Sequence, residues 1–283
     1  MTYTCLISVE DLANWPGGSG LVIVDCSFSL ADAGAGLEEY LAGHIPGARY
    51  LHLEYDLSSL SDGRNGRHPL PDAQVLAATL RRLGLSQGDQ VVTYDASGGP
   101  FAARAWWLLR WLGHSAVAVL DGGRKAWAEA GLPFEQGELP ELSIGDFETV
   151  EPNQRMTVDA AEVLASIGAP DALVLDARTA SRFRGEANPL DPISGRIPGA
   201  ANRFYGDNLA ADGRFKPPAI LADEFASTLD GTAPAGVILQ CGSGVTACHN
   251  ALAMEAAGLR GARLYPGSWS EWIVDPERPR ARG

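Results

Sequence analysis

The sequence lacks several features that would assign it to common classes of protein. No apolar run among its 283 residues approaches the roughly 18–20 residues that span a membrane. The first residues, MTYTCLISVEDLANWPGG, contain neither a basic segment nor an apolar core, so we expect no signal peptide. The net charge of -13 argues against nucleic acid or an anionic membrane as a partner. We therefore expect a globular cytoplasmic protein.

Cysteine and lysine are also scarce. The four cysteines (Cys5, Cys26, Cys241 and Cys248) form no CxxC pair, and no cysteine–histidine cluster has the spacing of zinc ligands. This pattern argues against a structural metal and against a disulfide framework, and it favours a reducing compartment. Of the 22 basic residues only two are lysines. The rest are arginines, a side chain suited to the recognition of small oxyanions.

The most informative segment that is present is VILQCGSGVTAC, residues 237–248. Its apolar start predicts a short buried strand, and the run TACHNALAMEAA predicts a helix that ends at Gly258. Gly242 and Gly244 allow a tight loop whose backbone N–H groups surround one point. We expect Cys241 to face both this loop and a helix N-terminus, which favour the thiolate form of cysteine.

An alternative interpretation treats Cys241 as a structural cysteine that only precedes a helix. Cys248, seven residues further on, is either a resolving thiol or a small buried residue of the helix, and we favour the second role. The rest of the chain decides between these interpretations of Cys241.

Five short sequence motifs occur twice in the same order, which indicates a duplicated domain. The pairs are LVIVDCS with LVLDART, GHIPGA with GRIPGA, DGR with DGR, TYDASGG with LQCGSG, and LDGGRKAW with YPGSWSEW. The offset drifts from 151 at Asp25 and Asp176 to 145 at Trp127 and Trp272. A period of this length excludes a solenoid of short repeats.

Each copy alternates short apolar strands with helical segments, so we predict an α/β fold with parallel strands and helices on both faces of each sheet. The predicted domains are residues 1–135 and 157–283, joined by a linker at 136–156. Asp95 occupies the loop position of the first domain and Cys241 that of the second. A carboxylate cannot form a persulfide, so we expect only the second domain to be reactive.

Together these motifs resemble the tandem-domain rhodanese-type sulfurtransferases over nearly the whole chain. The CGSGVT loop is similar to that of the 3-mercaptopyruvate branch of the family. The resemblance implies two rhodanese-like domains, an inactive first and a catalytic second, with Cys241 carrying sulfur as a persulfide and no cofactor. The residues implied to bind the substrate around that cysteine are Gly242, Ser243, Gly244, Val245 and Thr246.

The resemblance also implies an anion-binding arginine, which Arg182 matches. Mercaptopyruvate enzymes usually carry a second arginine nine residues further on, and this chain has Asp191 there. Arg184 and Arg196 are candidates to replace the missing cation. This departure puts the specificity for mercaptopyruvate in question.

Some members of this branch carry a serine, a histidine and an acid around the cysteine. The nearest matches here are Ser243, His68 and Glu54. From the first predicted domain, His68 can reach the cleft between the domains. Because it is a lone histidine beside a proline, a plain surface histidine is the alternative interpretation.

The expected reaction moves sulfur from a small anionic donor to a thiol, such as a small thiol or a thioredoxin-like protein, or to cyanide. The neutral loop favours 3-mercaptopyruvate, because the sulfonate end of thiosulfate lies close to the attacked sulfur and favours basic loop residues. Thiosulfate:cyanide sulfurtransferase and a non-enzymatic persulfide carrier remain as alternatives. A cysteine phosphatase is disfavoured, because Ala247 stands where phosphate-binding loops require arginine.

Overall fold

The computed structural model of the chain describes residues 2–16, 20–138, 143–149, 151–187 and 189–283. The chain folds into two compact units, of which the first comprises Met1–Ser59, Pro71–Asn153 and Ala211–Phe215 and the second Leu60–Leu70, Gln154–Ala210 and Lys216–Gly283. Residues 60–70, which lie in the first half of the sequence, therefore pack with the second unit. Part of the predicted linker at 136–156 lies outside the described residues.

The first unit is built on a parallel five-stranded sheet in the order β1-β5-β4-β2-β3. The strands are β1 (Leu6–Ile7), β2 (Leu21–Asp25), β3 (Arg49–Tyr50), β4 (Gln90–Tyr94) and β5 (Val117–Leu120). All five residues of the central strand β4 (QVVTY) are buried, as expected of a parallel strand covered on both faces. The residue that follows β4 is Asp95, at the carboxyl end of the sheet.

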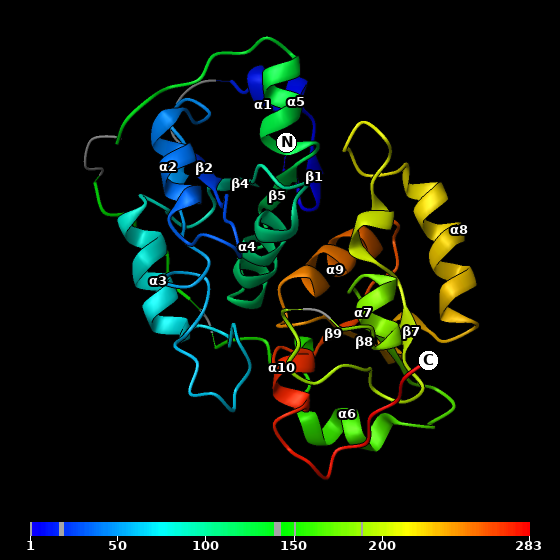
Figure 1. The fold of residues 1–283 in the computed structure, drawn as a ribbon. Helices are drawn as coiled ribbons and strands as arrows, with labels where there is room; N and C mark the ends of the chain where they lie inside the picture. The colour runs from blue at the N-terminus through cyan, green and yellow to red at the C-terminus, as the bar shows by residue number, and fades with distance from the viewer. Residues whose placement is uncertain (1, 17–19, 139–142, 150, 188) are drawn as a thin grey trace. The chain divides into compact units, whose positions relative to one another are not determined.

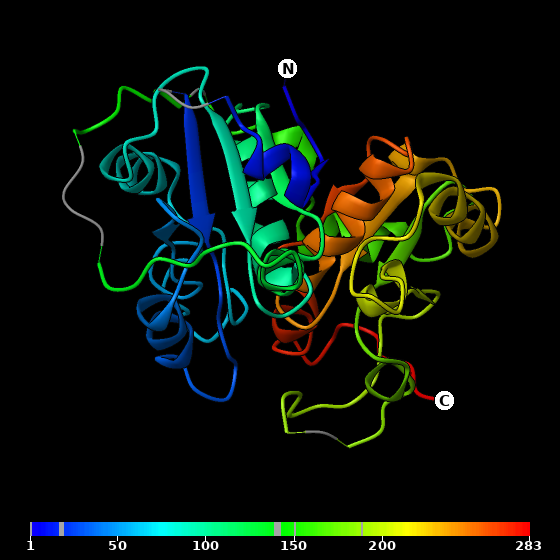
Figure 2. The same ribbon diagram turned by 90° about the horizontal axis from the view of Figure 1, so that it is seen from above.

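Helices cover both faces of this sheet (Figures 1 and 2). They are α1 (Val9–Ala13), α2 (Ala35–Ala42), α3 (Ala73–Arg82), α4 (Pro100–Trp111) and α5 (Gly123–Glu129). Helix α4 begins with proline, whose fixed φ suits the first turn of a helix. Almost all of its side chains are buried, so it forms the core of the unit rather than its surface.

The second unit repeats this plan with a parallel sheet in the order β7-β6-β8-β9. The strands are β6 (Leu173–Asp176), β7 (Ala201–Asn202), β8 (Val237–Gln240) and β9 (Arg263–Leu264). A single parallel bridge joins Thr157 to Leu264, at the place where β1 pairs with β5 in the first unit. The two sheets therefore share one strand order, which confirms the predicted α/β fold.

The helical segments of the second unit are α6 (Ala160–Ser166), α7 (Ala180–Arg184), α8 (Pro218–Leu229), α9 (Thr246–Ala256) and α10 (Ser268–Trp272), with short 3-10 turns at Gln154–Met156, Tyr205–Asn208 and Pro234–Gly236. The tryptophans aligned by the repeat have the same role in both units. Trp127 donates its indole N–H to the carbonyl of Pro133 over 2.8 Å, and Trp272 donates to Pro279 over 2.9 Å. Both side chains are buried in their cores.

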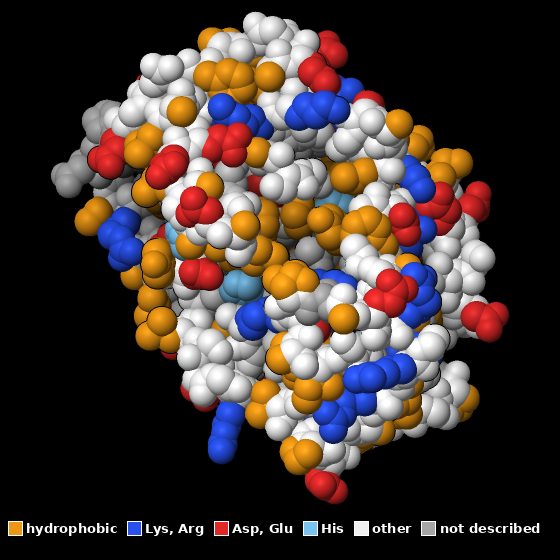
Figure 3. Space-filling view, in the orientation of Figure 1, with side chains coloured by type: hydrophobic (Ala, Val, Ile, Leu, Met, Phe, Trp, Pro, Cys, Tyr) orange, Lys and Arg blue, Asp and Glu red, His pale blue; other side chains and the backbone are white. Residues whose placement is uncertain are grey.

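Within the part of the chain that the structure describes, none of the helices combines the length and the hydrophobicity of a membrane span. On the face of the molecule in Figure 3, acidic side chains are interspersed with basic ones.

Candidate active site

Cys241 lies between the end of strand β8 and the start of helix α9, as the sequence predicts. Its side chain is almost completely buried, with 2% of its surface exposed. Gly244 in the loop has φ +77°, and a Cβ atom there would lie 2.3 Å from the carbonyl oxygen of Pro266. Only glycine therefore fits at this turn, which folds the chain back toward the N-terminus of α9.

The loop is held by the chain around the start of helix α10. The N–H of Cys241 donates to the Oγ atom of Ser268 over 3.1 Å, and its carbonyl accepts from the N–H of Trp269 over 3.0 Å. Ser268 has φ +52°, a left-handed conformation that serine seldom adopts, and its hydroxyl in turn donates to the carbonyl of Tyr265. Such strain is maintained only where the surrounding structure requires it.

Two arginines reach the loop at the residue directly after the cysteine. The Nη2 atoms of Arg182 and Arg67 each lie 2.7 Å from the point where a Cβ atom on Gly242 would stand. Both guanidinium groups therefore occupy the space of the missing side chain. The loop itself is neutral, but the second unit brings two positive charges to it from residues far away in the sequence.

Asp191 gathers these cations around one buried carboxylate. Arg182 forms a two-pronged ion pair with it, through Nε at 2.8 Å and Nη2 at 2.6 Å. Nη1 of Arg178 lies 3.3 Å away and Nη1 of Arg67 3.7 Å away. The aspartate that replaces the expected second arginine is thus the counter-ion of the first.

The charges of this cluster act on one another. Burial raises the pKa of Asp191, but its arginine partners outweigh burial and hold that pKa below its usual range. Burial lowers the pKa of the Arg67 guanidinium, and the neighbouring charge of Arg182 adds to that effect. Asp191 and a thiolate at Cys241 act in the opposite direction on Arg67. The cysteine therefore lies within the electrostatic reach of the cluster.

Arg178 forms the rear of the cluster. Its side chain is fully buried, and its Nη2 atom lies 2.7 Å from the carboxylate of Asp176 at the end of strand β6. Its guanidinium also stacks over the ring of Trp269, 4.8 Å from the ring centre. Arg178 therefore has its own carboxylate partner, whereas Arg67 and Arg182 both depend on Asp191.

His68 and Ser243 are brought together, as the family pattern suggested. The Nδ1 atom of His68 lies 2.8 Å from the Oγ atom of Ser243, and both side chains are buried. The contact forms because residues 60–70 pack with the second unit. Glu54, the expected acid, is an exposed residue of the first unit.

The two candidate replacements for the missing arginine do not join the cluster. Arg184 is half exposed and pairs with Glu186. Arg196 stacks over the ring of Phe183 and donates to the carbonyl of Gly283 at the chain end. Their guanidinium groups are thus engaged away from the loop, and Arg67 supplies the second cation there.

Cys248 lies in the first turns of helix α9, where it is fully buried. Its thiol donates to the carbonyl oxygen of Gly244 over 3.3 Å. This side chain therefore supports the loop from within the helix.

The equivalent loop of the first unit is filled by its own side chain. The carboxylate of Asp95 accepts four backbone N–H groups, at 2.8 Å from Ser97 and Gly99, 2.9 Å from Phe101 and 3.0 Å from Ala102. Burial raises the pKa of Asp95, and the four N–H groups act against that effect. Each oxygen thus accepts two of the four N–H groups.

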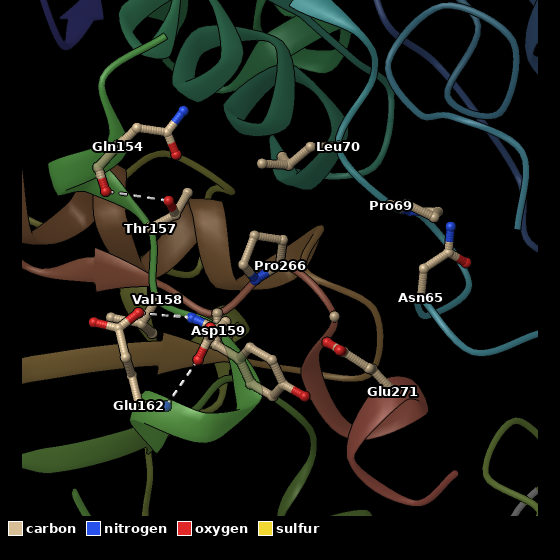
Figure 4. Close-up of a pocket in the computed structure, with 12 residues that line it drawn as sticks. Asn65, Pro69, Leu70, Gln154, Thr157, Val158, Asp159, Glu162, Pro266 and Glu271 are labelled. Carbon is tan, nitrogen blue, oxygen red and sulfur yellow. Dashed lines mark hydrogen bonds between the residues drawn. The ribbon is translucent and has the colours of Figure 1, made fainter. Parts of the chain in front are cut away.

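A separate pocket of about 490 Å³ lies within the second unit. Figure 4 shows Pro266 at its centre, between Thr157 on one side and Pro69 on the other. Acidic residues line it, including Asp159 and Glu271. Among its lining residues there is neither a cysteine nor an arginine, so it is distinct from the cysteine site. Across the described part of the chain, no group of three His, Cys, Asp or Glu side chains is arranged to hold a metal ion.

Sequence reasoning missed Arg67, Arg178 and Ser268. Nothing in the local pattern around Arg67 marks it, because its contact with the loop depends on how residues 60–70 pack. Ser268 did leave a signal, because the repeat aligns it with Gly123. Gly123 has a positive φ, which serine seldom adopts, so a serine at the equivalent position indicates a specific role.

Comparisons with known proteins agree on one family. The model of the rhodanese-like domain matches residues 8–130 and again 159–275. A protein of Pseudomonas aeruginosa named "Probable 3-mercaptopyruvate sulfurtransferase" is 48% identical over 285 residues, which cover 100% of each chain. The thiosulfate sulfurtransferase of Gallus gallus is 33% identical over 90% of this chain and 87% of its own. The solved 3-mercaptopyruvate sulfurtransferase of Leishmania major has a TM-score of 0.85 and 28% identity, over 98% of this chain and 75% of that one.

Proposed function

Because this chain belongs to the rhodanese-like domain family, we propose that it is a sulfurtransferase that moves sulfur from a small anionic donor, through a persulfide on Cys241, to a thiol acceptor. One observation carries the proposal. A buried cysteine at the mouth of an amide loop stands beside two guanidinium groups that converge on Gly242. A nucleophilic sulfur and a site for an anion are thus combined in one place.

We propose 3-mercaptopyruvate as the donor, because the relative that is 48% identical to this chain is named a probable 3-mercaptopyruvate sulfurtransferase. The Cys241 thiolate attacks the sulfur of the donor, an S–S bond forms, and the bond between that sulfur and the methylene carbon breaks. The electron pair of the broken bond leaves as the enolate of pyruvate. The proton of the donor thiol ends on the enolate carbon, so the products are pyruvate and a deprotonated persulfide.

The loop amides, the two arginines at Gly242 and the pair of His68 and Ser243 each have a proposed part in this step. The N–H groups of residues 242–246 and the N-terminus of α9 stabilise the negative charge of the terminal sulfur. Arg182 and Arg67 bind the carboxylate of the donor and orient its sulfur toward Cys241. The pair of His68 and Ser243 carries the proton from the donor thiol to the enolate, for which its 2.8 Å contact is suited.

In the second half of the cycle, an acceptor thiolate attacks the outer sulfur of the persulfide and regenerates the Cys241 thiolate. We propose a small thiol or a thioredoxin-like protein as the acceptor. No organic cofactor or metal has a part in this scheme. A cytoplasmic location stays a prediction.

Thiosulfate is the second candidate donor, and one observation favours it. Arg67 and Arg182 place cations beside Gly242, where a neutral loop would otherwise leave a sulfonate without partners. Attack of the thiolate on the outer sulfur of thiosulfate would release sulfite and leave the same persulfide.

We also propose that residues 1–135 are an inactive domain, 136–156 a linker and 157–283 the catalytic domain, to which residues 60–70 add Arg67 and His68. This assignment of the inactive and the catalytic domain is supported by the residues at the two equivalent loop positions, Asp95 and Cys241. Asp95 has no sulfur to offer, and its carboxylate already takes the amides that would stabilise a persulfide.

The test compares kcat/KM for 3-mercaptopyruvate and for thiosulfate, with cyanide as the acceptor. Cys241→Ser is the blank, and Cys5→Ser is the matched control that removes a thiol outside the site. A preference for mercaptopyruvate supports the proposed donor, and a preference for thiosulfate replaces it with the second candidate. If neither donor is turned over while Cys241 still accepts sulfur from a protein persulfide, the chain is a carrier and the proposed enzyme is wrong.

A further inference from the structure

We infer that Asp191 determines the charge of the donor that this site prefers, by compensating the arginines at the loop so that a monoanion fits better than a dianion. The inference rests on the proposed function and names its substrate class. It concerns the residue that stands where the resemblance led us to expect a cation.

The charges around the loop support this role. Three arginines, Arg67, Arg178 and Arg182, have side-chain nitrogens between 2.6 and 3.7 Å from the carboxylate of Asp191. Arg178 is paired separately with Asp176. Apart from the Cys241 thiolate, these three positive and two negative charges leave one net positive charge at the loop. The thiolate of Cys241 is present for either donor and does not alter the comparison between them.

Because the thiolate lowers the charge of the site by one for either donor, the two donors differ only in the second negative charge of the dianion. A dianion brings a second negative charge into a site whose cations are already partly neutralised, and uncompensated charge in a buried site is costly. Without the charge of Asp191 the site would be more positive by one unit, and a dianion would gain more from that change than a monoanion. Asp191 has 1% of its side chain exposed, so water screens it little.

The geometry leaves donor-binding groups available. Asp191 accepts from Nε and Nη2 of Arg182, and the guanidinium has a further nitrogen, Nη1, on its other side. Nη1 of Arg67 lies 3.7 Å from Asp191 and donates to the carbonyl of Leu190, whereas Nη2 is the atom that reaches the loop at Gly242. Asp191 therefore reduces the positive charge of the site, while some N–H groups of the two arginines remain unbound to it and can bind the substrate.

An orienting role for Asp191 is the competing explanation, and it predicts a different result. If Asp191 only held Arg182 in place, its loss would lower activity with both donors by the same factor. If its charge sets the preference, the ratio of the two kcat/KM values changes. Asp191→Asn separates the roles, because asparagine keeps the shape and one carbonyl acceptor but lacks the charge.

The experiment measures the ratio of kcat/KM for thiosulfate to that for 3-mercaptopyruvate. We expect the ratio to rise about tenfold in Asp191→Asn, and to fall by a similar factor in Arg67→Met, which removes a positive charge. The double variant should return to within about threefold of the starting ratio. Glu186→Gln is the matched control: it removes an exposed carboxylate that pairs with Arg184, and its ratio should not change.

A second readout does not depend on turnover. Sulfate, a dianion, and pyruvate, a monoanion, should each protect Cys241 from alkylation by iodoacetamide, and Asp191→Asn should shift the protection toward sulfate. An unchanged ratio in a folded Asp191→Asn variant, in both readouts, would overturn the inference while leaving the proposed function intact. If that variant does not fold, an unchanged ratio in Arg67→Met overturns it instead. If the natural chain turns over neither donor and neither anion protects Cys241, the proposed function fails and the inference fails with it.

Discussion

The two strand-to-helix loops of the molecule share a backbone plan and differ in what fills them. In the first unit, the carboxylate of Asp95 accepts four N–H groups of its own loop and helix. In the second, the matching position is Cys241, and Ser243, Val245 and Ala247 stand where three of those donors stand. The Asp95 carboxylate thus marks the position that an anion occupies in such a loop. In the second loop we expect the negatively charged sulfur of the persulfide to occupy the equivalent position.

The supports of the two loops match closely. The carbonyl of Asp95 accepts from Arg124 over 3.1 Å, as that of Cys241 accepts from Trp269 over 3.0 Å. Gly123 has φ +54° and its counterpart Ser268 has φ +52°. Since the scaffold is the same, the difference in chemistry comes from a few side chains: a sulfur in place of a carboxylate, the arginines around Asp191, and the hydroxyl of Ser268.

The largest expected effect comes from converting the second loop into the first. Cys241→Asp should abolish turnover of both donors, by at least about a thousandfold in kcat, because a carboxylate cannot form a persulfide. The folded state should persist, because the new carboxylate can accept the loop amides. Steady-state kinetics and urea unfolding measure the two effects. Cys5→Asp, outside the loop, should keep its turnover, and any persistent turnover in Cys241→Asp would mean that another group carries sulfur.

A change in the first loop tests how much the contacts between Asp95 and the loop amides contribute to the stability of the protein. Asp95→Asn places an NH₂ group against two backbone N–H groups, so we expect the free energy of unfolding to fall by about 2–4 kcal/mol. Turnover per folded molecule should be unchanged at low temperature. Urea unfolding followed by tryptophan fluorescence measures the change.

The control for Asp95→Asn is Asp212→Asn, which alters an exposed aspartate of the first unit and should have little effect. Equal effects of the two variants would show that the amide contacts of Asp95 contribute no special stability.

Ser268 distinguishes the supports of the two loops. Ser268→Ala leaves the buried N–H of Cys241 without its acceptor and should cost about 1–3 kcal/mol, with kcat lowered about tenfold. Ser268→Gly copies Gly123 of the first unit. It should be about 1 kcal/mol more stable than the alanine variant, because glycine adopts this φ freely, yet just as slow. Ser166→Ala, in helix α6, is the control. Full activity in the glycine variant would remove Ser268 from the positioning of Cys241.

Cys248→Ser should have the smallest effect. The hydroxyl can still donate to the carbonyl of Gly244, so we expect less than about 1 kcal/mol of destabilisation and kcat/KM within about threefold of the natural value. Turnover with a thiol acceptor is the measurement. A loss of more than about tenfold would instead identify Cys248 as a resolving thiol.

Much of the fold follows from local patterns. The apolar run before Cys241 became strand β8, Val237–Gln240, and the helix predicted from Thr246 begins at that residue. The repeat predicted two units with one plan, which the shared strand order confirms. Such features are readable because strand and helix periodicity, and the backbone freedom of glycine, act between residues close in sequence.

The candidate site was predicted only in part. Sequence placed Cys241 in its loop and drew attention to Arg182 and Asp191, but it counted Asp191 as a missing cation. In the structure the two are partners, nine residues apart, and Asp191 pairs with Arg182 through both oxygens. From the sequence, Arg184 and Arg196 were candidates to replace the missing arginine. In the structure Arg184 pairs with Glu186, and Arg196 contacts Phe183 and Gly283.

By itself, the sequence determined the duplicated α/β fold, the strand-to-helix loop and the asymmetry between Asp95 and Cys241. Only the tertiary structure decided which charges surround that cysteine. His68 meets Ser243 across 175 positions of sequence, and Arg67 reaches Gly242 from the same segment. Electrostatic and hydrogen-bond partners are chosen by distance in space. Long arginine side chains extend that choice beyond any pattern between neighbours in the chain.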